Sequence, residues 1–214
     1  MRAVRDAEPC RTVGLMAGPT RWVTDTKPGH SQWYVERFRT MAADGADLGG
    51  EARLVDAMVP PRSRVLDAGC GTGRVGAVLD DRGHTVVGVD ADPALIEAAR
   101  TDHPGPRWLV ADLAELDLAS AGEPEPFAAA VLAGNVMIFL APGTETEVLR
   151  RVAAHVVADG FVVIGFRSNE ELTLDRFDEC VIEAGLRIEH RFATWDLRAW
   201  NADADFAVTV LRHA

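Results

Sequence analysis

The residues with the clearest chemical potential lie in one short stretch, 65–76, which reads Val-Leu-Asp-Ala-Gly-Cys-Gly-Thr-Gly-Arg-Val-Gly. An apolar segment, expected to be a buried strand, leads to Asp67, and Gly69, Gly71 and Gly73 follow before a helix is expected to begin. Glycines at alternate positions let the backbone turn with positive φ and approach a ligand closely. A loop of this kind, between a strand and a helix N-terminus, is where α/β sheets hold nucleotide-like ligands.

The spacing of the glycines leaves two kinds of nucleotide open. Gly71, Gly73 and Gly76 fit the dinucleotide pattern G-x-G-x-x-G, with Asp90 placed 19 residues beyond Gly71 to bind a ribose. Asp67 argues against a dinucleotide, because a carboxylate beside a pyrophosphate repels it. The same carboxylate attracts an ammonium or sulfonium group, and S-adenosylmethionine (SAM) carries both cations and no phosphate.

Further apolar segments end in polar residues at similar intervals along the chain. The segments 85–90 and 107–112 each end in an aspartate, and 127–140 contains an asparagine after its apolar run. With these motifs the chain resembles the class I SAM-dependent methyltransferases, whose glycine motif is acid-x-Gly-x-Gly-x-Gly. The resemblance covers residues 64–140 closely and extends loosely to about residue 212.

The resemblance implies roles for individual residues. Asp90 would bond the two ribose hydroxyls, Asp112 would lie near the adenine amino group, and Asn135 would face the methyl group. The full set of cofactor contacts carried over in this way is Asp67, Gly69, Cys70, Gly71, Gly73, Asp90, Ala91, Asp112, Leu113 and Asn135.

Methyl transfer makes modest demands on catalytic side chains, because the sulfonium is already activated and alignment can account for most of the rate. The candidates are Asn135, which would orient a nucleophile, His30, which would accept a proton, and Tyr34, which would bond the methionine carboxylate. The alternatives are that Asn135 caps its strand and that Tyr34 only docks a helix. Two tryptophans in the segment 194–200 would form either a substrate wall or a cover for the last strands.

The order of elements predicts an α/β fold. Strands and helices alternate from residue 64 onward, and the last two strands follow each other without a helix between them. Together with the resemblance, this predicts a three-layer Rossmann-like sandwich with a seven-stranded, mostly parallel sheet and an antiparallel C-terminal hairpin. Residues 1–25 are expected to be a disordered tail, and 26–214 one domain whose N-terminal lid helices lie within 26–60. The expected strands are 64–69, 85–90, 107–111, 128–134, 161–166, 187–194 and 205–212, and the expected helices include 74–82, 93–101, 144–157 and 173–184. Gly160 and Gly185 are expected to end the last two of these helices.

Composition narrows the class of partner. The 214 residues carry a net charge of −11, which disfavours nucleic acid and favours a small-molecule acceptor. Three widely spaced cysteines and the absence of an apolar signal or span fit a cytoplasmic protein without a membrane segment, and no histidine pair has metal-ligand spacing. A homodimer is compatible with the sequence. The predicted function is SAM-dependent methyl transfer to a small molecule; the alternatives are an NAD-type oxidoreductase and a non-catalytic SAM-binding protein.

Overall fold

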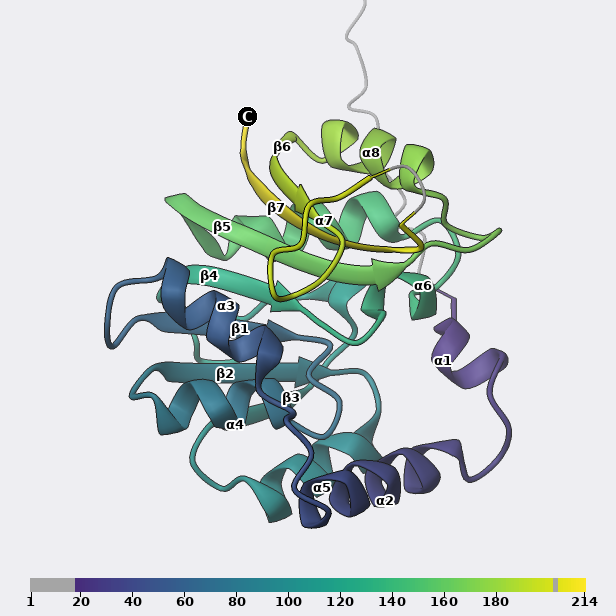
Figure 1. Cartoon of the computed structure of the whole chain (residues 1–214), viewed down its shortest axis with the longest axis vertical. Coiled ribbons are helices and arrows are strands. Elements are labelled where there is room, and N and C mark those ends of the chain that lie inside the picture. The colour runs from purple at the N-terminus through teal and green to yellow at the C-terminus, as the bar shows by residue number, and fades with distance from the viewer. Residues whose placement is uncertain (1–17, 202–203) are drawn as a thin grey trace, which may run out of the picture.

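A seven-stranded sheet with the strand order β3-β2-β1-β4-β5-β7-β6 runs through the protein (Figure 1). The structure is a computed structural model that describes residues 18–201 and 204–214. Neighbouring strands are parallel except where β7 runs antiparallel to both β5 and β6. The predicted fold class is confirmed. The strands are β1 (Arg64–Ala68), β2 (Thr85–Asp90), β3 (Arg107–Val110), β4 (Phe127–Leu132), β5 (Val156–Arg167), β6 (Leu186–Phe192) and β7 (Phe206–His213).

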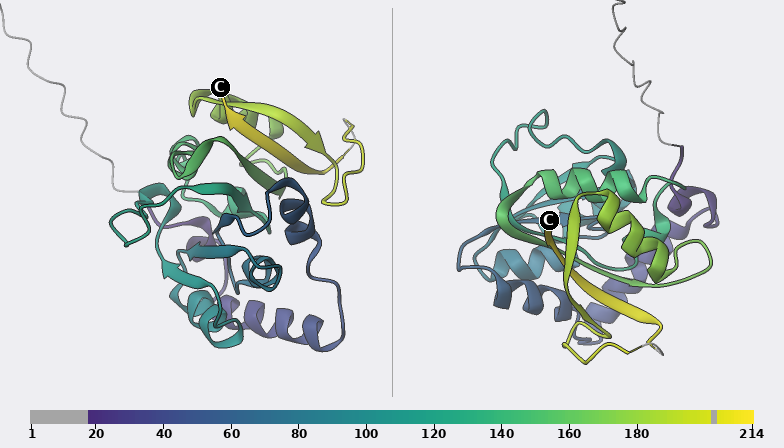
Figure 2. Two further views of the ribbon diagram at one scale, coloured as in Figure 1. Left: turned by 90° about the vertical axis from the view of Figure 1, so that its left-hand side faces the viewer. Right: turned by 90° about the horizontal axis from the view of Figure 1, so that it is seen from above.

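Helices cover both faces of the sheet (Figure 2). Val65 and Val86 pack toward α3 and α4, whereas their chain neighbours Leu66 and Val87 pack toward α7 and α8. Successive side chains of a strand point to opposite faces, so an uninterrupted apolar run fills two cores at once. The helices are α1 (Arg21–Thr24), α2 (His30–Ala43), α3 (Gly50–Met58), α4 (Arg74–Asp81), α5 (Pro93–Asp102), α6 (Val136–Phe139), α7 (Glu145–Ala154) and α8 (Leu174–Glu183), with a 3₁₀ turn η1 (Leu113–Glu115).

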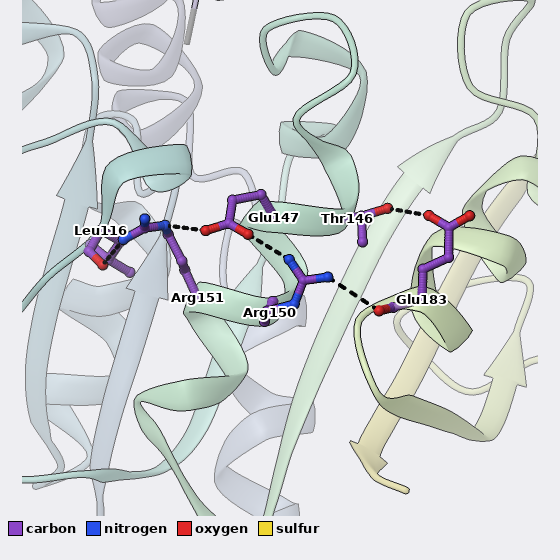
Figure 3. Close-up of polar contacts among 6 residues, drawn as sticks. All are labelled: Leu116, Thr146, Glu147, Arg150, Arg151 and Glu183. Carbon is purple, nitrogen blue, oxygen red and sulfur yellow. Dashed lines mark hydrogen bonds and ion pairs between the residues drawn. The ribbon is translucent and has the colours of Figure 1, made fainter. Parts of the chain in front are cut away.

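Polar side chains at the surface tie α7 to its two neighbours, as Figure 3 shows. Thr146 Oγ1 donates to Glu183 Oε2 of α8 at 2.9 Å, and Arg150 Nη2 donates to the Glu183 carbonyl oxygen at 3.2 Å. On the other side, Arg151 Nη1 donates to the Leu116 carbonyl oxygen at 3.3 Å, just after η1. These contacts fix the layer behind β4 and β5, whose carboxyl ends border the site described below.

Two sequence expectations differ from the structure. The helix expected over 144–157 ends at Ala154, and β5 begins at Val156 because Val156 pairs with Phe127 of β4. Gly160, expected to end that helix, lies inside β5, where a Cβ would stand 2.6 Å from the Ala128 carbonyl oxygen.

The second difference concerns the expected N-terminal tail. Its last part, residues 18–25, contains the helix α1, and Arg21 of that helix donates to the Leu140 carbonyl oxygen through its backbone N–H at 3.5 Å and through Nη1 at 3.4 Å. Tertiary contacts order this short segment although it has no hydrophobic period of its own. Residues 1–17 of the expected tail lie outside the described residues.

Candidate active site

A hollow lies at the carboxyl ends of β1, β2 and β4. Between β1 and β4 the strand order changes direction, and open α/β sheets bind ligands at such a point. The hollow comprises about 680 Å³, part of it open to solvent, which is within the usual range for a small-molecule pocket. Seven of the residues predicted to serve the cofactor or the chemistry line it: Tyr34, Gly69, Gly71, Asp90, Ala91, Asp112 and Leu113.

The glycine loop after β1 is shaped by close backbone contacts. Gly69 has a φ of +76°, and a Cβ there would stand 2.5 Å from a methyl carbon of Val136, so only glycine fits. At Gly71 a Cβ would approach Tyr34 at 3.5 Å. The loop is therefore bare backbone on the side that faces the pocket, as contact with a ligand requires.

Asp90, at the end of β2, is held by the loop it faces. Its Oδ2 accepts a hydrogen bond from the Gly71 N–H and its Oδ1 accepts one from the Asp92 N–H, each at 2.9 Å. Burial raises the pKa of Asp90 to about 6, against the lowering effect of these backbone donors. The carboxylate is thus oriented by backbone N–H groups, and among the described residues no Lys, Arg or His side chain forms an ion pair with it.

Asp67 lies deeper than the sequence prediction placed it. Its side chain is 1% exposed, does not line the hollow, and accepts a hydrogen bond from the Gly76 N–H at 2.9 Å. Burial raises the pKa of Asp67 to about 7. The geometry ties Asp67 to the start of α4, and its contact with the cofactor remains a prediction.

Asp112 follows β3 and begins η1. Its Oδ1 accepts a hydrogen bond from the Ala114 N–H at 2.8 Å, which caps the turn. Within residues 18–201 and 204–214, its Oδ2 has no hydrogen-bond partner. One oxygen of Asp112 is therefore free for a ligand that donates a hydrogen bond, and the neighbouring Leu113 supplies apolar lining.

Tyr34 reaches the pocket from α2. Its hydroxyl oxygen stands 3.8 Å from the position that a Cβ would take on either Gly71 or Gly134, between the loops that follow β1 and β4. Burial raises the pKa of Tyr34, so the group is a neutral phenol at neutral pH. Beside it Arg74 forms an ion pair with Glu51 of α3, which leaves that cation already neutralised.

Asn135 and His30 lie outside the lining. The Asn135 side chain carbonyl accepts a hydrogen bond from the Arg167 N–H at 2.8 Å, so it closes the end of β4 onto β5. The ring of His30 packs edge-on against Trp22 at 4.7 Å. Both residues border the site through neighbours, and a direct catalytic role for either remains a prediction.

Three further residues named from the sequence are packed against neighbouring residues and do not line the hollow. Cys70 is buried within the loop, and burial raises the pKa of its thiol well above the ordinary value, which leaves it unreactive. Gly73 faces the ring of Trp108, which a Cβ would approach at 2.7 Å. Trp195, one of the two loop tryptophans, packs against Gly165 of β5, and neither Trp195 nor Trp200 lines the hollow.

The lining also includes residues that the sequence argument missed. Trp22 of α1 is the most prominent, with its indole edge-on to Tyr34 and to Phe139, each at 5.3 Å. A large aromatic residue in a segment otherwise rich in polar residues, Pro and Gly was the available signal. The other missed lining residues are Thr20, Val23, Asp92, Leu95, Phe139 and Leu140, whereas Ala133, Gly134 and Val136 flank the predicted site residue Asn135.

Comparisons with known proteins agree with this geometry. The model of a methyltransferase domain matches residues 65–160. The chain is 40% identical to a TehB-like SAM-dependent methyltransferase from Corynebacterium glutamicum, over 88% of this chain and 100% of that one, with a TM-score of 0.82. It is similar in fold to the CcbJ methyltransferase from Streptomyces caelestis, at 18% identity over 77% of this chain and 89% of that one, with a TM-score of 0.67. It is also 38% identical over 71 residues to the uncharacterized methyltransferase YodH of Bacillus subtilis, a match that spans 31% of this chain and only 30% of that relative.

The chain belongs to the SAM-dependent methyltransferases, and its cofactor is S-adenosyl-L-methionine. The residues present fit this group. Asp90, Asp92 and Asp112 line the hollow, and among the described residues that line it none is Lys, Arg or His. A negative, glycine-walled pocket of this kind suits a sulfonium and an ammonium.

Two further features concern residues 18–201 and 204–214. No helix there is both long and apolar enough to cross a bilayer. No group of three His, Cys, Asp or Glu side chains there is placed to hold a metal ion.

Proposed function

We propose that this protein transfers the methyl group of S-adenosyl-L-methionine to a small-molecule acceptor that enters beside Trp22, Phe139 and Leu140. The observation that carries the proposal is the charge of the pocket. Its lining holds three carboxylates and, within the described part of the chain, no basic side chain. The bound cofactor would supply a methyl group already activated on a sulfonium.

The same charge argues against the NAD-type alternative. A pyrophosphate is stabilised by backbone N–H groups and cations, and carboxylates that line its site destabilise it. The Gly71 N–H, which a phosphate would need, already donates a hydrogen bond to Oδ2 of Asp90 at 2.9 Å. No feature of the pocket favours a dinucleotide over S-adenosyl-L-methionine.

The residues of the pocket divide the work of binding. Asp90 would accept hydrogen bonds from the ribose hydroxyls, for which its orientation by Gly71 and Asp92 prepares it. Asp112 would accept one from the adenine amino group through its unpartnered oxygen. Trp22 and Phe139 form an apolar wall that would exclude water from the acceptor.

The three residues predicted to be catalytic would act differently. Tyr34 lines the pocket and would touch the methionine part of the cofactor with a neutral hydroxyl. Asn135 would hold the β4 end in place through Arg167, and His30 would support Trp22. The chemistry would then depend on alignment and on an acceptor that is nucleophilic without a dedicated histidine base.

The first test is calorimetric titration of the purified protein with S-adenosyl-L-methionine, S-adenosylhomocysteine and NADH in parallel. We expect micromolar binding of the first two and none of NADH. Binding of NADH alone would overturn the proposal.

A second test addresses turnover. A panel of amine, phenol, thiol and carboxylic acid acceptors is incubated with the cofactor, and S-adenosylhomocysteine is quantified by mass spectrometry. Product that depends on both acceptor and enzyme supports methyl transfer. Tight cofactor binding with no product across the panel would favour the non-catalytic alternative.

A further inference from the structure

Asp92 connects the wall of the cofactor pocket to two elements of the N-terminal segment. Its Oδ1 accepts the Ala94 N–H at 2.8 Å and so caps α5. Its Oδ2 accepts two more hydrogen bonds, from Trp22 Nε1 of α1 at 2.8 Å and from the hydroxyl of Ser31 at the start of α2. The sequence explains only the cap of α5. The second oxygen of Asp92 binds α1 and the start of α2, which lie over the pocket.

Trp22 bridges opposite sides of the pocket. Its indole contacts Tyr34 of α2 on one side and Phe139 of α6 on the other, with ring centroids 5.3 Å apart in both pairs. A ligand bound beneath it cannot leave on this side unless the indole moves. Movement of the indole must break the hydrogen bond to Asp92.

The helix that carries Trp22 has little stability of its own. α1 is four residues long and buries no residue completely, and helices of this length do not persist in isolation. Besides Trp22, Arg21 anchors it through the Leu140 carbonyl and through an ion pair with the buried Glu145 at 3.5 Å. Contacts made by Arg21 and Trp22, rather than a helical core, hold α1 in place, so loss of these contacts would release α1 as a unit.

We propose that Asp92 is a latch that positions Trp22 over the cofactor pocket and thereby sets the rate at which S-adenosyl-L-methionine and S-adenosylhomocysteine exchange. The backbone N–H of Asp92 also donates a hydrogen bond to Oδ1 of Asp90, at 2.9 Å. Asp92 is thus hydrogen-bonded to the carboxylate that is proposed to hold the ribose. The inference rests on the cofactor assignment and is independent of the identity of the acceptor.

Three substitutions separate the latch from the packing around it. Trp22→Phe keeps an aromatic ring but removes the Nε1 donor together with part of the indole's contact area. Asp92→Asn keeps an acceptor for the Ala94 N–H but turns an amide NH₂ toward the two donors, which opens the latch. Ser31→Ala removes the second donor, and Trp33→Phe is the matched control, because Trp33 is 54% exposed and does not line the pocket.

The measurement is the dissociation rate of S-adenosylhomocysteine by stopped-flow displacement, with the thermal midpoint recorded for each variant. A hydrogen bond to a charged acceptor contributes enough that we expect dissociation to be about tenfold faster in Trp22→Phe and in Asp92→Asn. Ser31→Ala should show a smaller increase, and Trp33→Phe should match the wild type.

A double-mutant cycle distinguishes the latch from direct contact between Asp92 and the ligand. If Asp92 acts through Trp22, adding Asp92→Asn to Trp22→Phe changes the rate little further. Rates that multiply independently, or single variants that release the ligand at the wild-type rate, would overturn the latch. If Asp92→Asn does not fold, Trp22→Phe and Ser31→Ala still decide, because each leaves the α5 cap intact. A wild-type protein that binds no S-adenosylhomocysteine would overturn the proposed function, and the latch with it.

Discussion

The carboxyl and amino edges of the sheet hold acidic side chains in opposite electrical surroundings. At the amino edge, Glu123 accepts hydrogen bonds from Arg64 at 2.8 Å and from Arg107 at 2.6 Å. At the carboxyl edge, Asp90 and Asp112 accept hydrogen bonds from backbone N–H groups. A carboxylate neutralised by cations of its own chain stabilises the fold, whereas one oriented by backbone donors keeps its charge for a ligand.

A second amino-edge acid follows the same rule. Asp56 pairs with Arg82 and, at 3.0 Å, with Nε2 of the buried His84. Both partners hold the pKa of Asp56 below its ordinary value, with the His84 hydrogen bond as the larger cause. Burial at the carboxyl edge does the reverse, raising the pKa of Asp67 to about 7. The two edges are therefore expected to respond to pH with opposite signs.

The largest expected effect is on the pH dependence of unfolding. Folded Asp67 keeps its proton up to a pKa of about 7, whereas the unfolded chain releases it near 3.8. Its contribution therefore lowers the free energy of unfolding as pH rises between these values, by roughly 4 kcal/mol in all. Asp67→Asn keeps the acceptor for Gly76 without the charge, so denaturation at pH 5 and pH 8 should show a weaker decline than in the wild type. Equal slopes would contradict the effect of burial.

The next effect is on ligand affinity. Asp90→Ala should weaken binding of S-adenosyl-L-methionine about tenfold or more, because it removes charge-assisted hydrogen bonds to the ribose and frees the Gly71 N–H. Calorimetry gives the dissociation constant directly. Unchanged affinity would exclude Asp90 from the ribose site.

The amino edge supplies the matched control. Glu123→Ala leaves Arg64 and Arg107 without their shared carboxylate and should lower the free energy of unfolding by about 1–2 kcal/mol. Affinity for S-adenosyl-L-methionine should not change, since Glu123 lies at the other end of the strands. A large loss of affinity in Glu123→Ala would contradict the assignment of ligand binding to the carboxyl edge alone.

The smallest effect is expected at Asp56. Its ion pairs are partly exposed, so Asp56→Asn should cost about 0.5 kcal/mol at neutral pH. Because its folded pKa is lowered, this stabilisation is present above the ordinary value of 3.8 and disappears as pH falls through the folded pKa. Urea titrations at pH 7 and pH 3 should therefore show a smaller difference between variant and wild type at the lower pH. A difference that grew in acid would contradict the assignment.

The sheet and two of the three pocket acids, Asp90 and Asp112, could be predicted because each strand of this part of the sheet is a short apolar run that ends at a polar residue. Such a run has a strong signal, and the carboxyl ends of parallel strands meet at one edge, so Asp90 and Asp112 had to lie near the glycine loop. The burial of Asp67 could not be predicted, since sequence alone does not show that its carboxylate accepts a hydrogen bond from the Gly76 N–H. Local order was predictable; the direction of one side chain was not.

The N-terminal segment shows why the rest was not predictable. Trp22 lies in a helix of only four residues, which has no period to detect, and its position depends on His30, Tyr34 and Phe139, up to 117 residues away. Gly160 has a strong local signal that gave a wrong prediction. Glycine commonly ends helices, but Gly160 lies within β5, where it accommodates a close approach to β4. In both cases tertiary contacts outweighed local preference.

The ring of Trp108 beneath the glycine loop has a consequence for how such sequences are classified. A Cβ on Gly73 or on Gly76 would come within 2.7 Å or 2.8 Å of that ring. Two of the three glycines in the dinucleotide-like pattern are therefore required by an indole from β3 and carry no information about a phosphate. A pattern search that scores them as a ligand signature counts one packing constraint twice, so these two glycines do not distinguish one cofactor from the other.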